Sequence, residues 1–295
     1  MSGWKAVFRG PGGLRAGWRL LLFAAVATVL MSGLPWIAVK AGWKPRAGFD
    51  PADFLMADGL GLVALVLAAW LMASIERVRP SVYGLAFQAG FLRRVAEGIA
   101  WGSGTVLAVA AAMAALGGLS IAGLALHGRA LAGSAALWAA AMIVLGLFEE
   151  YLFRGYPQRT LASGIGFWPA ATLLSAGFGA LHYFTKPRET VIDAATVALL
   201  GFFLCFTLAR TGDLWLAVGY HAAFDYAALV VLASPNTGMP PGERVPGHLL
   251  ETSFSGPVWL TGGDCGLEAS LFMFPALALL FFLFDRRSRP GEPPR

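Results

Sequence analysis

Two adjacent glutamates and an arginine stand inside an apolar part of the chain. They belong to the run LFEEYLFR at 147–154, which follows an apolar segment that begins near Ala135. A charge at the centre of a membrane helix costs about 2.5–3.5 kcal/mol on insertion scales, so such residues are rare and usually functional. On a helix, Glu150 and Arg154 share a face, whereas Glu149 lies about 100° away. We therefore expect an internal Glu150–Arg154 ion pair and a second carboxylate, Glu149, that is available for acid–base chemistry.

Two further motifs place histidines inside apolar segments. Phe178-x-x-x-His182 and His221-x-x-x-Asp225 each put two side chains four residues apart, and therefore on one face of a helix. One shared cavity would keep these groups and the glutamates out of lipid with the fewest assumptions. We therefore interpret these groups as one functional site. The plainer alternatives are a hydrogen-bonded core position for His182 and a local hydrogen bond between His221 and Asp225.

The composition is that of a membrane protein. The 295 residues are 57% hydrophobic and 13% charged, with a mean hydropathy of +0.66, whereas charged residues make up about 25% of soluble chains. We therefore expect an all-α, polytopic bundle of membrane helices. The net charge of +5 does not indicate nucleic-acid binding, because most basic residues lie beside the ends of apolar segments, where they orient the chain in the membrane. The two cysteines, Cys205 and Cys265, cannot form a disulfide framework or a CxxC metal site.

Apolar runs predict about eight transmembrane helices. The expected spans lie near 18–39, 54–75, 95–117, 134–153, 166–183, 190–210, 213–233 and 268–284. The connection at 234–267, with five prolines and seven glycines, is typical of a long loop or lid. Asp58, Glu97 and Asp193 lie toward the ends of expected helices, where solvation at the membrane interface is the default.

The distribution of Lys and Arg predicts the orientation. Basic residues are more frequent on the side of the membrane that holds both termini, so both are expected to be cytoplasmic. The chain then divides into a cytoplasmic N-terminal segment at 1–17, a single transmembrane domain at 18–284 and a cytoplasmic tail at 285–295. The expected location is the cell (inner) membrane, as a multi-pass protein.

Straight helices would not bring the three motifs together. Glu149 would lie near the cytoplasmic end of its helix, His182 near the far end of the next and His221 in the middle of its own, since a helix rises about 1.5 Å per residue. One shared cavity therefore requires a helix that is broken, displaced or re-entrant. Gly155-Tyr-Pro157 and Gly164-x-Gly166 offer places for such a break.

The three motifs, in this order on successive membrane segments, resemble the CPBP family of intramembrane proteases. This family, also called ABI, includes CAAX prenyl endopeptidases and bacteriocin-processing or immunity proteins. The resemblance covers about residues 134–233, which it marks as the catalytic core, and it implies that a peptide bond is hydrolysed within the bilayer. In the family's proposed mechanism the first glutamate and the histidine of the second motif activate a water, while the third motif faces the oxyanion. The residues that correspond to the family's site are Glu149, Glu150, Arg154, His182, His221 and Asp225.

One position departs from the pattern of the prenyl endopeptidases, which carry Asn where this chain has Asp225. An ionised Asp cannot donate a hydrogen bond to an oxyanion. Asp225 is therefore protonated, or orients His221, or belongs to a metal site. The family is often called a metalloprotease, and a divalent metal such as zinc would have His182, His221 and Asp225 as candidate ligands. The HExxH signature is absent from the chain, so a metal stays an open alternative.

Two other classes of protein remain as alternatives. A proton-coupled transporter also uses buried Glu, His and Asp, but it favours inverted repeats with polar interruptions in both halves, and the N-terminal half has almost none. A non-catalytic immunity or binding membrane protein could keep the same site. The expected partners are membrane lipid and a membrane-associated protein or peptide substrate. If the Ala/Gly/Arg-rich composition indicates a bacterial chain, a membrane-inserted peptide or leader is a better substrate than a prenylated protein.

Overall fold

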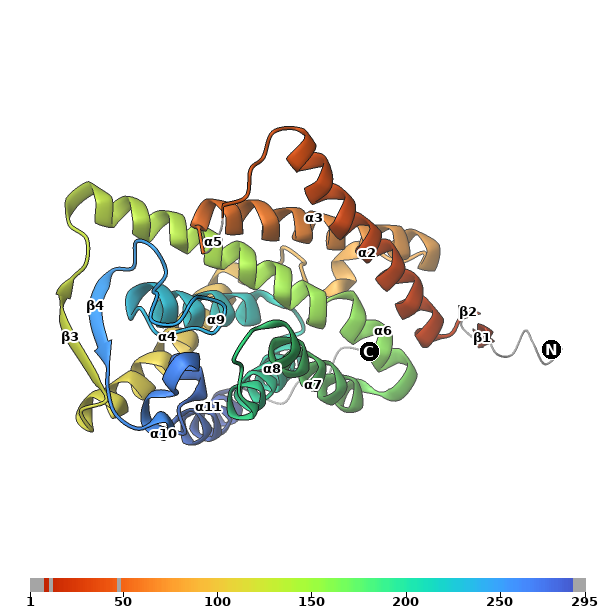
Figure 1. Cartoon of the computed structure of the whole chain (residues 1–295). Helices are drawn as coiled ribbons and strands as arrows, with labels where there is room; N and C mark the ends of the chain where they lie inside the picture. Colours follow the sequence, from red (N-terminus) through yellow and green to blue (C-terminus); the bar gives the residue numbers. More distant parts are fainter. Residues whose placement is uncertain (1–7, 11–12, 47–48, 289–295) are drawn as a thin grey trace.

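The protein is described by a computed structural model that covers residues 8–10, 13–46 and 49–288. Most of the expected cytoplasmic segments at 1–17 and 285–295 therefore lie outside or at the limits of the described residues. Figure 1 shows long helices packed side by side, with two short strands, β3 and β4, at one end of the bundle. The all-α membrane bundle expected from the composition is confirmed.

The elements follow the apolar runs of the sequence closely. The helices are α2 (Ala16–Lys40), α3 (Pro51–Glu76), η1 (Pro80–Tyr83), α4 (Phe91–Ala115), α5 (Gly128–Arg154), α6 (Tyr156–Ile165), α7 (Phe167–Thr185), α8 (Val191–Thr211), α9 (Trp215–Asp225), η2 (Tyr226–Val231), α10 (Val258–Thr261), η3 (Gly263–Ala269) and α11 (Met273–Arg287). The strands are β1 (Arg9–Gly10), β2 (Gly13–Leu14), β3 (Leu119–Leu124) and β4 (Leu250–Phe254).

Among the described residues, six helical runs are long and apolar enough to cross a membrane. They are α2, α3, α4, α5 with α6, α8, and η3 with α11. The other two expected spans correspond to α7, which is not among the six, and to α9 with η2, a shorter apolar helix. The multi-pass architecture is therefore present, whereas the count of eight spans is not confirmed.

A helix break after Arg154 places the first two motifs at one depth. Gly155 has ψ −117°, and a Cβ there would lie 2.5 Å from the carbonyl oxygen of Tyr151, so only glycine fits. Pro157 lies in the first turn of α6, where its missing N–H costs no hydrogen bond. Because α6 continues the helical run of α5, Glu149 lies well inside a run of 38 residues instead of at its end. The chain then turns at a glycine with φ +90° and returns as α7.

Helix α9 lies at the centre of the bundle and is buried along its length. Glycines allow the neighbouring backbones to approach it closely. A Cβ on Gly98 or Gly102 of α4 would lie 2.1 Å or 2.3 Å from carbonyl oxygens of α9, and a Cβ on Gly219 of α9 would lie 2.3 Å from one of α4. Small residues thus bring α4 against α9, as the Gly98-x-x-x-Gly102 spacing indicates. The central helix carries the third motif.

The expected loop at 234–267 is partly ordered into regular structure. Its strand β4 pairs antiparallel with β3, with a register irregularity between Ile121 and Gly123. Backbone hydrogen bonds from Ala125 N to Leu249 O and from Ser255 N to Gly118 O extend the pairing at its two ends, and Leu249 N donates to Val230 O of η2. The expected long connection is therefore present, and it contains a strand that the sequence did not predict, because its hydrogen-bond partners lie far away in the sequence.

Ion pairs identify one end of the bundle, which we call the arginine-rich end. Arg19 at the start of α2 pairs with Glu76 at the end of α3, at 2.8 Å. Arg94 at the start of α4 pairs with Asp213 just before α9, and Arg210 at the end of α8 pairs with Asp285 near the end of α11. The first and last long helices therefore have their outer ends on the same side. The opposite side, which carries β3 and β4, is called the strand end.

Candidate active site

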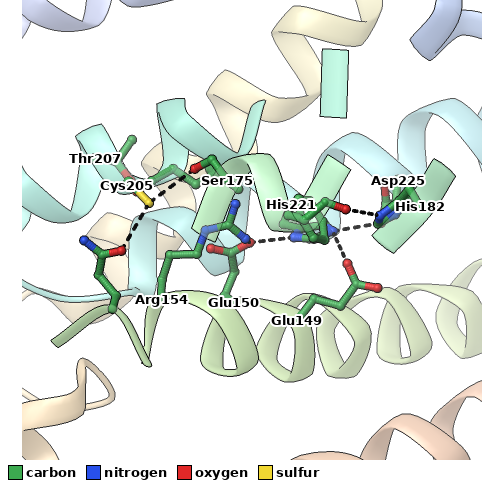
Figure 2. A network of polar contacts seen from close by, with 12 residues as sticks. Glu149, Glu150, Arg154, Ser175, His182, Cys205, Thr207, His221 and Asp225 are labelled. Carbon is green, nitrogen blue, oxygen red and sulfur yellow. Dashed lines mark hydrogen bonds and ion pairs between the residues drawn. The ribbon is translucent and has the colours of Figure 1, made fainter. Parts of the chain in front are cut away.

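His221 is the hub of the site, and carboxylates face both of its ring nitrogens. Its Nδ1 lies 2.8 Å from Oε1 of Glu150, and its Nε2 lies 3.4 Å from Oε2 of Glu149. The same Nε2 is also 3.4 Å from Oδ2 of Asp225, one turn along α9. Figure 2 shows Glu149 and Glu150 leaving α5 as neighbours and reaching His221 from different sides. The first and third motifs are thus in direct contact.

The ion pair expected between Glu150 and Arg154 is present. Nη1 of Arg154 lies 3.2 Å from Oε1 of Glu150, and both side chains are fully buried. The guanidinium also stacks 4.8 Å from the ring centroid of Phe178, a cation–π contact that links the first motif to the second. Oε2 of Glu150 and Nε and Nη2 of Arg154 have no hydrogen-bond partner among the described residues. A buried charge needs a partner, so each member of this pair depends on the other.

The space for the Arg154 guanidinium is provided by a glycine on α8. A Cβ on Gly201 would lie 2.3 Å from Nη2 of Arg154 and 3.3 Å from Phe178. Beside it, Sγ of Cys205 lies 3.8 Å from Oγ of Ser175. Cys205 is therefore part of the packing behind the site, and neither cysteine forms a disulfide among the described residues.

His182 lies in the site without a direct hydrogen bond to Glu149 among the described residues. Its Nδ1 is 3.0 Å from the carbonyl oxygen of Phe178 one turn earlier, and its ring centroid is 4.6 Å from that of Phe178. A carbonyl only accepts, so Nδ1 carries the hydrogen and Nε2 of a neutral ring is an acceptor. Phe178 lies between the two histidines, with its centroid 6.2 Å from that of His221.

A cavity of about 180 Å³ joins the polar groups. It is lined by Glu149, His182, His221 and Asp225, whereas Glu150 and Arg154 are not among its described lining residues. Aliphatic and aromatic side chains of α3, α5, α7, α8, α9 and η2 form most of the remaining walls. The structure therefore brings the three motifs to one cavity and separates the two glutamates into one that faces it and one that lies behind His221.

We interpret the partly exposed lining at the strand end as the mouth of the cavity; it is formed by residues that the sequence did not single out. Phe49, Lys186, Asn236 and Glu268 line it and are partly exposed, whereas the deeper walls are mostly buried. All four come from connections or short elements at the strand end. The signal for Glu268 was a carboxylate at the start of an apolar run; the others lie in irregular segments, which carry no periodic pattern.

Two acidic residues expected at the solvated interface have buried carboxylate oxygens instead. Asp193 is 2% exposed, and its Oδ1 has no hydrogen-bond partner among the described residues. Oδ2 of Asp58 is likewise buried without a partner in the part of the chain described, within electrostatic range of Glu149. Their positions near helix ends were misleading, because packing of neighbouring helices covers them. Glu97, by contrast, is partly exposed.

The side chains of the site do not form a metal-binding group among the described residues. No three or more His, Cys, Asp or Glu side chains within it lie so as to hold a metal ion. His182 and His221 each use Nδ1 in a hydrogen bond, to a backbone carbonyl and to Glu150. His182, His221 and Asp225, the candidate ligands of the open metal alternative, are not among any such group in the described residues.

The fold and the site define a helical membrane protein with a buried carboxylate–histidine centre. Residues 131–227 match the family model described as type II CAAX prenyl endopeptidase Rce1-like. This range contains all three motifs and agrees with the resemblance to the CPBP family of proteases. Searches of curated proteins and of solved structures gave no significant match. The match therefore indicates a membrane protease.

Proposed function

We propose that this protein is an intramembrane endopeptidase that uses Glu149 to activate a water. The observation that carries the proposal is the different placement of two adjacent carboxylates. Glu149 faces the cavity together with His182, whereas Glu150 is bonded to Arg154 and His221 in a fully buried position. One glutamate can therefore meet a substrate and the other cannot.

In this mechanism, a water in the cavity donates hydrogen bonds to the Glu149 carboxylate and to Nε2 of His182. Glu149 removes a proton as the water oxygen attacks the carbonyl carbon of the peptide bond, and the protonated carboxyl then delivers that proton to the leaving amine. Such proton transfer contributes about 10²–10⁴-fold to rates. The Phe178 carbonyl supports this arrangement, because it holds the Nδ1–H of His182 and leaves Nε2 as an acceptor.

His221 is the proposed oxyanion donor. With Glu150 at Nδ1 and two carboxylates near Nε2, the surroundings suit an imidazolium that donates from both nitrogens. Glu150, held by Arg154, fixes the ring, and the Nε2–H turns to the oxygen of the tetrahedral intermediate. Asp225 has the role of orienting His221, which an Asn oxygen would also fulfil. A fixed donor of this kind is worth about 3 kcal/mol.

The position of the cavity mouth bears on the substrate. Because the mouth lies at the strand end, a scissile bond would enter from the side opposite the arginine-rich end. The positive-inside rule assigns the arginine-rich end to the cytoplasm. The proposed substrate is therefore a membrane-inserted peptide or leader that is reached from the non-cytoplasmic side, and not a prenylated cytosolic protein.

The test is cleavage of a quenched peptide library by the purified protein in liposomes. Glu149→Gln should reduce turnover by about 10²–10⁴-fold and leave the melting temperature unchanged, because Gln fits the same cavity wall. Glu251→Gln is the matched control, since Glu251 is exposed on β4, and it should cleave like the wild type. Wild-type turnover in Glu149→Gln would show that another group is the base.

Metal analysis of the same preparation addresses the remaining alternative. We expect cleavage to persist after treatment with a strong chelator. Stoichiometric zinc together with chelator-sensitive cleavage would contradict the metal-independent mechanism and would make His182, His221 and Asp225 the first ligands to substitute. Absence of cleavage under all conditions would favour a binding or transport function.

A further inference from the structure

A second hollow lies at the arginine-rich end, away from the proposed active site. Its volume is about 420 Å³, within the range of about 300–1,000 Å³ that small-molecule sites occupy. It lies where the start of α4, the end of α8 and the end of α11 meet. The residues that line it are Arg93, Glu97, Trp101, Arg210, Thr211, Leu216, Phe284, Arg287 and Ser288.

Two of its arginines share one carboxylate. Nε of Arg93 lies 3.8 Å and Nη2 of Arg287 lies 3.6 Å from the same Oε1 of Glu97, beyond the usual N–H···O distance of about 2.7–3.2 Å. Their side chains are 80% and 65% exposed. By contrast, Arg94 is held by Asp213, and Arg210 by Asp285. The hollow therefore carries a net positive charge, and guanidinium donors at its rim are open to a ligand.

The hollow also has an apolar floor, and the helices that form its walls carry exposed apolar side chains. Its floor is formed by Leu216 and Phe284, which are buried, with Trp101 partly buried above them. Trp is typical of the membrane–water interface. Elsewhere on the same two helices, α4 and α11, large apolar side chains are exposed: Leu92, Ile99, Leu279, Phe282 and Leu283. A ligand that fits both parts has an anionic head and apolar chains.

We propose that this hollow binds the phosphate of an anionic phospholipid, with the guanidinium groups of Arg93 and Arg287 on the phosphate oxygens and the acyl chains along α4 and α11. Arginines bind phosphate with two parallel N–H···O bonds. Basic pockets between helices at the cytoplasmic side are typical positions for anionic lipid heads. The apolar surfaces favour a lipid over a soluble phosphate. This site does not depend on the proposed protease activity.

The test measures binding of phosphatidylglycerol to the full-length protein in detergent by native mass spectrometry, with phosphatidylcholine of the same chains and inorganic phosphate as the other arms. Phosphatidylglycerol should bind more tightly than phosphatidylcholine, and inorganic phosphate should not displace it. Arg93→Gln with Arg287→Gln should weaken binding about 25-fold, at about five-fold per arginine. Arg79→Gln, an exposed arginine of the same end, is the control and should bind like the wild type.

A substitution that is expected to strengthen lipid binding shows whether the weaker binding of the double arginine variant reflects a loss of folding. Glu97→Gln removes the carboxylate between the two arginines and should tighten phosphatidylglycerol binding several-fold. Equal binding of both lipids, displacement by inorganic phosphate, or unchanged affinity in the double arginine variant would each overturn the proposal.

Discussion

The two sides of His221 hold the same kinds of side chain in different surroundings. On one side, Glu149 and Asp225 border a cavity at Nε2; on the other, Glu150 meets Nδ1 within full packing and is paired with Arg154. On the cavity side the carboxylates can change their hydrogen-bond partners, whereas on the packed side Glu150 cannot. The proposed function therefore assigns the two neighbouring carboxylates of this motif different roles, a chemical one to Glu149 and a structural one to Glu150. Substitutions on the two sides should therefore affect different properties.

The largest effect on folding is expected on the packed side. Glu150→Gln leaves Arg154 buried without its charged partner and weakens the bond to His221, so the free energy of unfolding should fall by about 3–5 kcal/mol. The measurement is denaturant unfolding in detergent, with Glu149→Gln as the comparison variant. Equal stabilities of the two variants would remove the distinction between the two sides.

A smaller loss should follow from filling the space that Arg154 occupies. In Gly201→Ala the new Cβ would lie 2.3 Å from Nη2 of Arg154, and the guanidinium cannot yield freely because it is buried against Phe178 and paired with Glu150. We expect a loss of about 1–3 kcal/mol together with reduced turnover. Gly177→Ala is the control, since no described atom lies within 4 Å of a Cβ there. This control should be neutral or stabilising by up to about 1 kcal/mol. A similar loss of stability in both variants would show that the loss comes from replacing a helical glycine and not from contact with Arg154.

The smallest effect is expected on the cavity side at Asp225. In Asp225→Asn an amide oxygen can still accept from Nε2 of His221, so kcat should stay within about ten-fold of the wild type, about 1.4 kcal/mol. Asp225→Ala removes the acceptor and should be less active than Asp225→Asn. If both variants lost activity to the same large extent, the negative charge and not the orientation of His221 would be what the site requires.

The sequence was sufficient to predict most of the helices, because apolar runs bounded by charges mark them directly. The first expected span, 18–39, is α2 at Ala16–Lys40, and the expected span 190–210 is α8 at Val191–Thr211. The short helix α6 and the β3–β4 pair were missed. Ten residues are too few to show a period, and the pairing of Leu119 with Phe254 depends on segments that meet only after the bundle has formed.

The candidate site was predictable in its motifs and not in its boundary. Residues four apart on a helix lie on one face, so the contacts Glu150–Arg154 and His221–Asp225 could be predicted. The hydrogen-bond partner of His182, a backbone carbonyl, could not be predicted, because every residue of a helix has a carbonyl group. Lys186 and Asn236 at the mouth come from irregular connections, whose positions are set by the helices around them.

The β3–β4 pair has a consequence for biosynthesis. Chains fold from the N-terminus as they are made, at about 5–20 residues per second. All three motifs are complete once Asp225 has been synthesised, but Asn236 and Glu268, which close the cavity, and β4, which pairs with β3, come later in the chain. The polar residues of the three motifs are therefore made before part of the lining of the cavity that they share. The complete cavity wall requires the segment that contains Asn236 and Glu268, which follows the motifs in the chain.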